Sequence, residues 1–192
     1  MQNNIWPNRF QITYNLFLRK HSDDVKVQVF MLKQDDPAKC TAAKLVKFGL
    51  AKQVRKTIQA TMILHPFAER LVLKKDKDLV DSITAVDCSW ELAQNVFAKN
   101  FLGFSRKLPP LLAGNPVNYA KIGKLTTAES IAATLFIMGI DEQAHEILNK
   151  FKWGHTFFEL NQDLLKDYSE AKTEENMVEI SGNYGIAYQL KG

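Results

Sequence analysis

Cysteine is scarce in this sequence, and long apolar runs are absent. The 192-residue chain contains two cysteines, Cys40 and Cys88, too few for a disulfide framework or for a metal site built from cysteine alone. Its four histidines are spread along the chain without the spacing of metal ligands, so we expect no metal. No apolar run is long enough to cross a bilayer, and the N-terminus lacks the charged-then-apolar order of a signal peptide. We therefore expect a protein of the reducing cytoplasm, with no membrane attachment.

The motifs that mark the most common enzyme classes are also absent. There is no Gly-x-Gly-x-x-Gly after a strand, no Gly-x-x-x-x-Gly-Lys loop and no Gly-x-Ser-x-Gly turn. These absences exclude the usual dinucleotide and nucleoside triphosphate fingerprints and the nucleophile elbow of hydrolases. The composition is that of an ordinary globular protein, with 46% hydrophobic and 24% charged residues. The length suits one domain or two small ones.

Charge is unevenly distributed along the chain. The net charge is +4, with lysines and arginines crowded at residues 39–56 and 106–124 and acidic residues at 159–179. Charged surface usually serves solubility. Two basic clusters on either side of a candidate site nevertheless raise the expectation of an anionic partner such as RNA.

Three short stretches have the patterns of strands. Residues 25–31 alternate between apolar and polar side chains, which predicts a strand with one buried face. Residues 61–64 and 82–86 are short apolar runs that predict two more buried strands. Because helical or connecting segments separate the three, we expect an α/β layer with a largely parallel sheet. Residues 1–22 alternate only in part, and we expect them to be an extension that could add an edge strand.

The last of these strands runs directly into Asp87. After it, Trp90, Ala93, Phe97 and Phe101 recur at the three- and four-residue spacing of a helix. Ligands of open α/β sheets bind outside the carboxyl ends of the strands, so one hypothesis places a carboxylate and an indole at a small-molecule site. The other hypothesis is structural: Asp87 caps the helix and Trp90 packs in the core. From this stretch alone the structural hypothesis is favoured.

The second half of the chain contains one long loop and then helices. Residues 103–126 are rich in glycine and proline but keep apolar side chains, which predicts an ordered, packed loop and a second place for a site. Residues 126–129 (TTAE) form a capping-box pattern that opens a helix ending at Gly139. Further helices are expected up to about Ala171, after which a polar run predicts a loosely held tail.

Four separated motifs carry a family resemblance. They are residues 36–41 (DPAKCT) with 44–45 (KL), residues 64–70 (LHPFAER), residues 86–90 (VDCSW), and residues 106–109 (RKLP) continued by 115–119 (NPVNY) and 124–126 (KLT). Together they resemble the aminocarboxypropyltransferase family that modifies small-subunit ribosomal RNA (rRNA), a SPOUT-like group. The resemblance covers roughly residues 25–170 and leaves out residues 1–22, so it is more specific than a lone fingerprint.

The resemblance implies a particular fold class. It is an α/β, SPOUT-like domain in which a parallel sheet forms a trefoil knot, followed by an all-α C-terminal domain that completes the cofactor pocket. The expected segments are an extension (1–22), the α/β domain with the cofactor site (23–108), the helical domain (109–180) and a tail (181–192). Knotted proteins of this class usually dimerise. Here the added helices would cover that surface, so we expect a monomer.

The implied reaction moves the 3-amino-3-carboxypropyl group of S-adenosylmethionine to N3 of a uridine-type base, which in eukaryotes is N1-methylpseudouridine. The sulfonium can be attacked at three carbons, so orientation decides the product. Trp90 is the expected wall of the pocket, because an indole face excludes water and attracts a cation by about 0.5–2 kcal/mol. Asp87 is the second expected catalytic residue, either as the general base for N3–H or as a group that orients the cofactor.

The cofactor contacts implied by the resemblance lie in the same motifs. Besides Trp90, they are the side chains of Leu64 and Pro66, the backbone at Val86, Leu108 and Gly123, and, for the carboxylate, Thr41 and Thr127. Both threonines lie near expected helix starts, which attract anions, and Thr41 is the expected cap of its helix. Gly123 stands where the family often has tyrosine, so only a backbone contact is implied there. Ala42 and Ala120 stand where glycine is common, which concerns local turn geometry.

The expected partner is small-subunit rRNA or a pre-ribosomal subunit. Attack at N3 needs an unpaired base, so an exposed RNA loop is the expected target. Two alternatives remain open: a SPOUT-type RNA methyltransferase with the same cofactor, and a non-catalytic RNA-binding factor of ribosome assembly, against which the presence of Asp87 and Trp90 argues. For any single lysine a solvated surface position is the simpler interpretation. The candidates for phosphate contacts are Lys44, Lys47, Lys52, Arg55, Arg106 and Lys107.

Overall fold

The computed structural model describes residues 24–32, 40–89, 92–98 and 101–187. Five strands form one sheet in the order β2-β1-β4-β3-β5, and every neighbouring pair is parallel. The prediction of a largely parallel sheet is confirmed, with β4 in the middle. The strands are β1 (Lys26–Met31), β2 (Lys52–Val54), β3 (Thr61–Leu64), β4 (Ser82–Asp87) and β5 (Phe104–Arg106).

One face of the sheet is apolar and belongs to the main core. Val27 and Val29 of β1 lie beside Ile83 and Ala85 of β4, and Met62 of β3 pairs with Ile83. All five side chains are buried in one hydrophobic cluster. Because successive strand side chains point to opposite faces, the alternation that predicts β1 also decides which face the helices cover.

The opposite face carries a hydrogen-bonded polar cluster. The hydroxyls of Thr61 and Thr84 lie 2.8 Å apart, and the Ser82 hydroxyl donates to Thr61 at 2.8 Å. The Thr84 hydroxyl also lies 3.1 Å from Oε1 of Gln28 in β1. All three hydroxyl residues are buried. Their bonds to one another offset the cost of removing hydroxyls from water.

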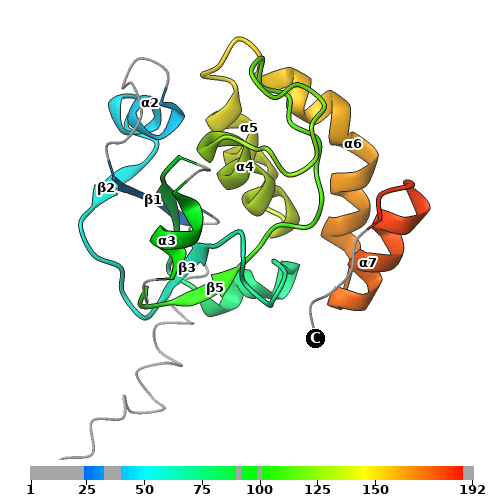
Figure 1. Cartoon of the computed structure of the whole chain (residues 1–192), viewed down its shortest axis with the longest axis horizontal. Helices are drawn as coiled ribbons and strands as arrows, with labels where there is room; N and C mark the ends of the chain where they lie inside the picture. The colour runs from blue at the N-terminus through cyan, green and yellow to red at the C-terminus, as the bar shows by residue number, and fades with distance from the viewer. Residues whose placement is uncertain (1–23, 33–39, 90–91, 99–100, 188–192) are drawn as a thin grey trace, which may run out of the picture.

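Helices cover the apolar face and extend beyond it. Helix α2 (Thr41–Lys47) packs on β1, and α4 (Thr127–Ile137) packs on β4, α2, α5 (Asp141–Leu148) and α6 (Gly154–Glu170). Helix α7 (Glu174–Asn183) packs on α6, so α4 to α7 lie together on one side of the molecule (Figure 1). The short helix α3 (Ala93–Phe97) instead forms a small cluster with Val86 of β4.

Helix α4 begins with the predicted capping box. The Thr126 side chain accepts from the N–H of Glu129, and the Glu129 side chain accepts from the N–H of Thr126. The helix ends before Gly139, whose φ of 75° is the left-handed conformation favoured by glycine. The predicted start and end of this helix are confirmed.

The predicted fold class is wrong in its finer parts. The helices do not form a separate all-α domain, because one hydrophobic cluster runs from Val29 and Ile83 in the sheet through α4 to Phe157 and Tyr168 in α6. The prediction of a SPOUT-like, knotted domain is also wrong. The described residues form an α/β unit with one parallel sheet and one main core. The predicted segment boundaries stay a prediction.

Three local predictions also change. Residues after Ala171 form α7, with Met177 and Ser181 buried, and not the predicted loose tail. The prediction missed this helix because only two of its positions are buried and the rest of its sequence is largely polar. The cap of α2 is Cys40 and not Thr41, since the Cys40 sulfur accepts from the N–H of Ala43. The strands β2 and β5 were missed because three residues are too few to show a period. Among the described helices, none has the length and hydropathy needed to span a membrane.

Gly154, the first residue of α6, is expected to tolerate no side chain. A Cβ there would overlap the backbone carbonyl of Leu148 at the end of α5, and backbone cannot move aside as a flexible side chain can. Gly154→Ala should therefore lower the free energy of unfolding by about 1–3 kcal/mol, measured by urea denaturation. Gly182→Ala in α7 is the control, because its Cβ meets nothing within 4 Å and alanine favours helix. An equal loss in both variants would contradict the overlap.

Candidate functional site

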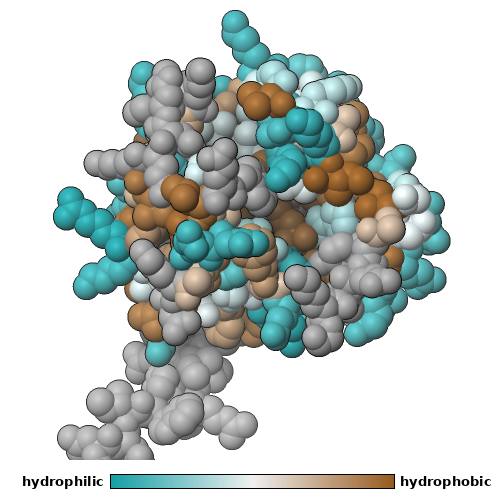
Figure 2. Space-filling view, viewed as in Figure 1, coloured by the Kyte–Doolittle hydropathy of each residue, from teal (hydrophilic) through white to brown (hydrophobic). Residues whose placement is uncertain are grey.

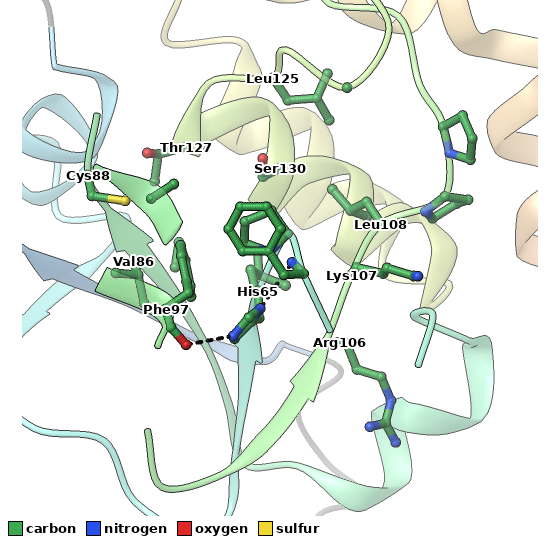
Figure 3. Close-up of a pocket in the computed structure, with 18 of the residues that line it drawn as sticks. His65, Val86, Cys88, Phe97, Arg106, Lys107, Leu108, Leu125, Thr127 and Ser130 are labelled. Carbon is green, nitrogen blue, oxygen red and sulfur yellow. Dashed lines mark hydrogen bonds between the residues drawn. The ribbon is translucent and has the colours of Figure 1, made fainter. Parts of the chain in front are cut away.

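A cavity opens at the carboxyl ends of three neighbouring strands (Figure 3). Its volume is about 370 Å³, and it is lined by Leu64 at the end of β3, Val86 of β4 and Arg106 at the end of β5. The opposite side is formed by the segment between β5 and α4, here called the wall loop (residues 107–125), and by the first turn of α4. Figure 2 shows apolar side chains gathered around a hollow on this face. Sheet geometry predicts a ligand site at this edge.

The cavity brings together six of the eight residues predicted for the cofactor. Thr41 does not line it; its hydroxyl accepts from the N–H of Ala128 at 3.3 Å, which holds the first turn of α2 against α4. Trp90 lies outside the described residues, and its role stays a prediction. The six that line the cavity are Leu64, Pro66, Val86, Leu108, Gly123 and Thr127.

Asp87 joins three elements beside the cavity. Its Oδ1 accepts from the hydroxyl of Thr127 at 2.9 Å, and its Oδ2 accepts from the thiol of Cys40 at 3.1 Å. The end of β4 is thereby tied to the start of α2 and to the start of α4. The helix-cap hypothesis is wrong, because α3 has Leu92 as its N-cap with no side-chain hydrogen bond.

The thiol of Cys40 is held in its neutral form. Burial is the largest cause that raises its pKa to about 11, and the hydrogen bond to Asp87 acts in the same direction, against the N–H of Ala43. A neutral thiol keeps its proton and so remains a donor to the carboxylate at neutral pH. Cys88, the other cysteine, lines the cavity.

His65 lies in the cavity wall as a neutral ring. Its Nδ1 accepts from the N–H of Phe67 at 3.1 Å, and its Nε2 lies 3.3 Å from the carbonyl oxygen of Phe97 (Figure 3). Because Nδ1 accepts, Nε2 carries the proton and donates to Phe97. Burial lowers the pKa of His65 below its ordinary value, which favours the neutral tautomer in this position.

Two buried polar side chains hold the wall loop. Oε1 of Glu129 accepts from the N–H groups of Gly114 and Asn115 at 2.7 and 2.9 Å, and Oε2 accepts from the Asn115 side chain at 2.8 Å. Asn161 in α6 bonds both the N–H and the carbonyl of Leu112 at 2.8 Å. Glu129 is 0% exposed and Asn161 is 1% exposed. The predicted packing of the loop is confirmed at Leu111 and Ala113 and is wrong at Val117, which is 82% exposed. Glu129 and Asn161 hold its backbone.

The predicted RNA contacts lie in two groups at opposite edges of the sheet. One group is in and around α2 and β2, and the other is at the end of β5. In the second group, the guanidinium of Arg106 points away from the cavity towards the 3-10 helix η2 (Lys74–Leu79) (Figure 3). There Nε and Nη2 both donate to Asp76 at 3.1 Å, which fastens η2 to β5. RNA contact stays a prediction for the first group, Lys44, Lys47, Lys52 and Arg55, and for the second, Arg106 and Lys107.

Sequence reasoning assigned no role to two aromatic side chains of the wall, His65 and Phe67. Both belong to the motif at residues 64–70. A short turn after a strand has no periodicity that shows where its side chains point. Glu129 was recognised only as part of the capping box, because its bonds to the wall loop join residues 14 and 15 positions apart.

Comparison with known proteins finds relatives over most of the chain. A family model described as "Ribosome biogenesis protein, C-terminal" matches residues 62–185. A 16S rRNA aminocarboxypropyltransferase from Methanosarcina mazei is 40% identical, covering 85% of this chain and 96% of its own. One from Saccharolobus islandicus is 44% identical, covering 79% and 91%. The chain belongs to this family.

A solved structure from this aminocarboxypropyltransferase family has an architecture similar to that of the chain. The SAM-dependent rRNA:acp-transferase from Vulcanisaeta distributa is 34% identical, with a TM-score of 0.77 over 84% of this chain and 90% of that chain. The similarity supports the α/β fold described above and gives no support to the predicted SPOUT class.

A second family model, described as a possible Fer4-like domain in RNase L inhibitor, matches residues 25–58. Iron–sulfur clusters of the ferredoxin type are held by four cysteine thiolates. The whole chain has two cysteines, and the one in this segment, Cys40, is a buried neutral thiol bonded to Asp87. The residues present do not fit a cluster.

The neutral state of His65 is expected to make stability depend on pH. Histidine in an unfolded chain has a pKa of about 6.5, and the fold lowers it, so below pH 6.5 or so the unfolded chain binds a proton that the folded chain does not. The free energy of unfolding should fall as the pH drops below this value, and His65→Gln should lose that part of the dependence. Urea denaturation over a pH series measures it. His155→Gln, at an exposed position, should keep the wild-type profile; a wild-type profile in His65→Gln would refute the assignment.

Replacing the carboxylate of Glu129 is expected to loosen the wall loop. In Glu129→Gln an amide N–H₂ would face backbone N–H donors, leaving buried groups unpaired. The free energy of unfolding should fall by about 2–3 kcal/mol. Hydrogen exchange should accelerate at Gly114 and Asn115, or at Thr126 where the amide oxygen keeps the first two. Glu146→Gln, on the exposed side of α5, is the control and should change neither. Unchanged exchange at all three amides would show that the loop is held without this carboxylate.

Proposed function

We propose that this chain transfers the 3-amino-3-carboxypropyl group of S-adenosylmethionine to a uridine-type base of small-subunit rRNA. The main support is the cavity at the carboxyl ends of β3, β4 and β5, which is lined by six of the residues assigned to donor binding. Relatives named 16S rRNA aminocarboxypropyltransferase, 40% and 44% identical along most of their length, support the same reaction.

The cavity suits this donor in size and chemistry. Its volume of about 370 Å³ falls within the range of small-molecule sites, about 300–1,000 Å³. Leu64 and Pro66 offer apolar surface to the adenine, and the backbone at Leu108 and Gly123 offers polar groups to its edges. Thr127 is the first residue of α4, where the helix dipole favours the donor's carboxylate.

The reaction requires one of three sulfonium carbons to face the base. Attack by a base nitrogen, N3 in this proposal, on the aminocarboxypropyl methylene forms a C–N bond. The C–S bond breaks, its electron pair goes to sulfur to give a neutral thioether, and the nitrogen loses its proton to water. Walls that enclose the methyl group and leave this methylene open select the product by orientation. We assign part of that wall to Trp90, three positions after Asp87.

We assign Asp87 to positioning rather than to proton abstraction. Both of its oxygens already accept hydrogen bonds, from Thr127 and from Cys40, which supports an orienting role. By accepting the single hydroxyl proton of Thr127, the carboxylate would keep this side chain in one rotamer. Thr127 would then attract the carboxylate of S-adenosylmethionine through its place at the start of α4 and not through its hydroxyl. The bond from Cys40 would keep the carboxylate of Asp87 in place.

An RNA substrate suits the charge of the chain. The net charge is +4, and Lys107 lines the cavity where the phosphates of a bound nucleotide would lie. Among the described residues, no group of three or more histidine, cysteine, aspartate or glutamate side chains could hold a metal ion. We propose that the chain acts as a monomer on rRNA or a pre-ribosomal subunit, in the cytoplasm.

The reaction can be tested directly with the purified chain. S-adenosylmethionine should bind in a calorimetric titration. Incubation with small-subunit rRNA that lacks the modification should then give a nucleoside heavier by one aminocarboxypropyl group, with methylthioadenosine as the second product. A methyl-sized gain would indicate a methyltransferase instead. Donor binding without any mass gain, or no binding, would leave RNA binding alone as the function.

A further inference from the structure

Phe67 is an aromatic side chain that lines the donor cavity and yet remains open to solvent. It lies in the turn after β3, next to Pro66, and is 48% exposed. A large apolar side chain left half in water at the edge of a cavity contributes little to the core. Because it lines the cavity, its open face is available to a ligand that enters the cavity.

The ring of Phe67 is held in a fixed place although it is exposed. Its backbone N–H donates to Nδ1 of His65 at 3.1 Å. Its ring meets those of His65 and Phe97 edge-to-face, with centroids 6.1 and 6.2 Å apart and interplanar angles of 83° and 80°. His65 is in turn bonded to the carbonyl of Phe97. The ring of Phe67 is therefore in place before a ligand arrives, which lowers the entropy cost of binding.

The edge of the cavity combines this aromatic surface with apolar and cationic groups. Ile122 of the wall loop also lines the cavity and is 52% exposed. Lys107 lines the cavity as well. The lining of the cavity therefore includes both an exposed aromatic ring and a lysine, the two kinds of group that bind single-stranded nucleic acids, since bases stack on rings and phosphates meet positive charge.

We propose that Phe67 is the stacking platform for the unpaired target base of the rRNA. This inference rests on the proposed function, because it assigns the second substrate of the same site. A base whose Watson–Crick edge must reach the donor cannot be paired during the reaction. Stacking on Phe67 would compensate for the lost stacking in RNA and hold the plane of the base at the mouth of the cavity.

The first test separates RNA binding from donor binding. Phe67→Ala should raise the KM for unmodified small-subunit rRNA by about ten- to a hundredfold, and should change the Kd for S-adenosylmethionine much less in calorimetry. Phe67→Trp should stay close to wild type, because it keeps an aromatic face. Phe67→Leu keeps apolar volume without that face and should resemble Phe67→Ala. Tyr184→Ala is the matched control, since Tyr184 is 43% exposed at the end of α7, in the acidic part of the chain, and does not line the cavity.

The second test locates the base. Unmodified rRNA transcribed with 4-thiouridine should cross-link under long-wavelength light to the tryptic peptide of residues 57–70, which contains Phe67. A wild-type KM in Phe67→Ala would overturn the proposal, and so would a wild-type KM in Phe67→Leu. Cross-links that form only outside the peptide of residues 57–70 would also overturn it. A donor Kd weakened as much as the KM would assign Phe67 to the donor instead. Failure of the proposed function looks different, because the wild-type chain would then add no aminocarboxypropyl group.

Discussion

The carboxylate of Asp87 accepts hydrogen bonds from two elements that are far apart in the sequence. Cys40 lies 47 positions before it and Thr127 lies 40 positions after it. These bonds bring the end of β4 and the starts of α2 and α4 to one point. Because α4 also packs against α5 and α6, the position of the helical layer relative to the strand ends depends on this junction. The cavity lies beside it and is lined by Val86 of β4 and by Thr127 of α4.

The cavity has a largely apolar lining, and much of its wall is held by polar bonds. Glu129 and Asn161 bond the backbone of the wall loop, and His65 bonds the backbone of Phe67 and Phe97. These bonds form when the chain folds, so a ligand does not have to order the wall when it binds. Such preorganisation matters for a sulfonium donor, because the orientation of three similar carbons decides which group is transferred.

Several elements could be predicted because their patterns arise within the element itself. The alternation at residues 25–31 and the capping box at 126–129 are local, and both β1 and α4 form as expected. The strands β2 and β5 are three residues each, so neither shows a period, and α7 buries too few side chains to stand out in a polar sequence. The predicted donor contacts came from motifs, and six of them meet in one cavity because the strands that carry or precede them end at the same edge of the sheet.

The sequence by itself determined the parallel α/β sheet, the start of α4, the ordered wall loop and the motifs that place the chain in its family. Only the tertiary structure decided that the helices share the core of the sheet instead of forming their own domain. It also decided that Asp87 caps no helix and instead bonds Cys40 and Thr127, and that Glu129 both caps α4 and holds the wall loop. The physical reason is the same in each case. Contacts between residues tens of positions apart depend on which strand and helix ends become neighbours, and they leave no periodic pattern in the sequence.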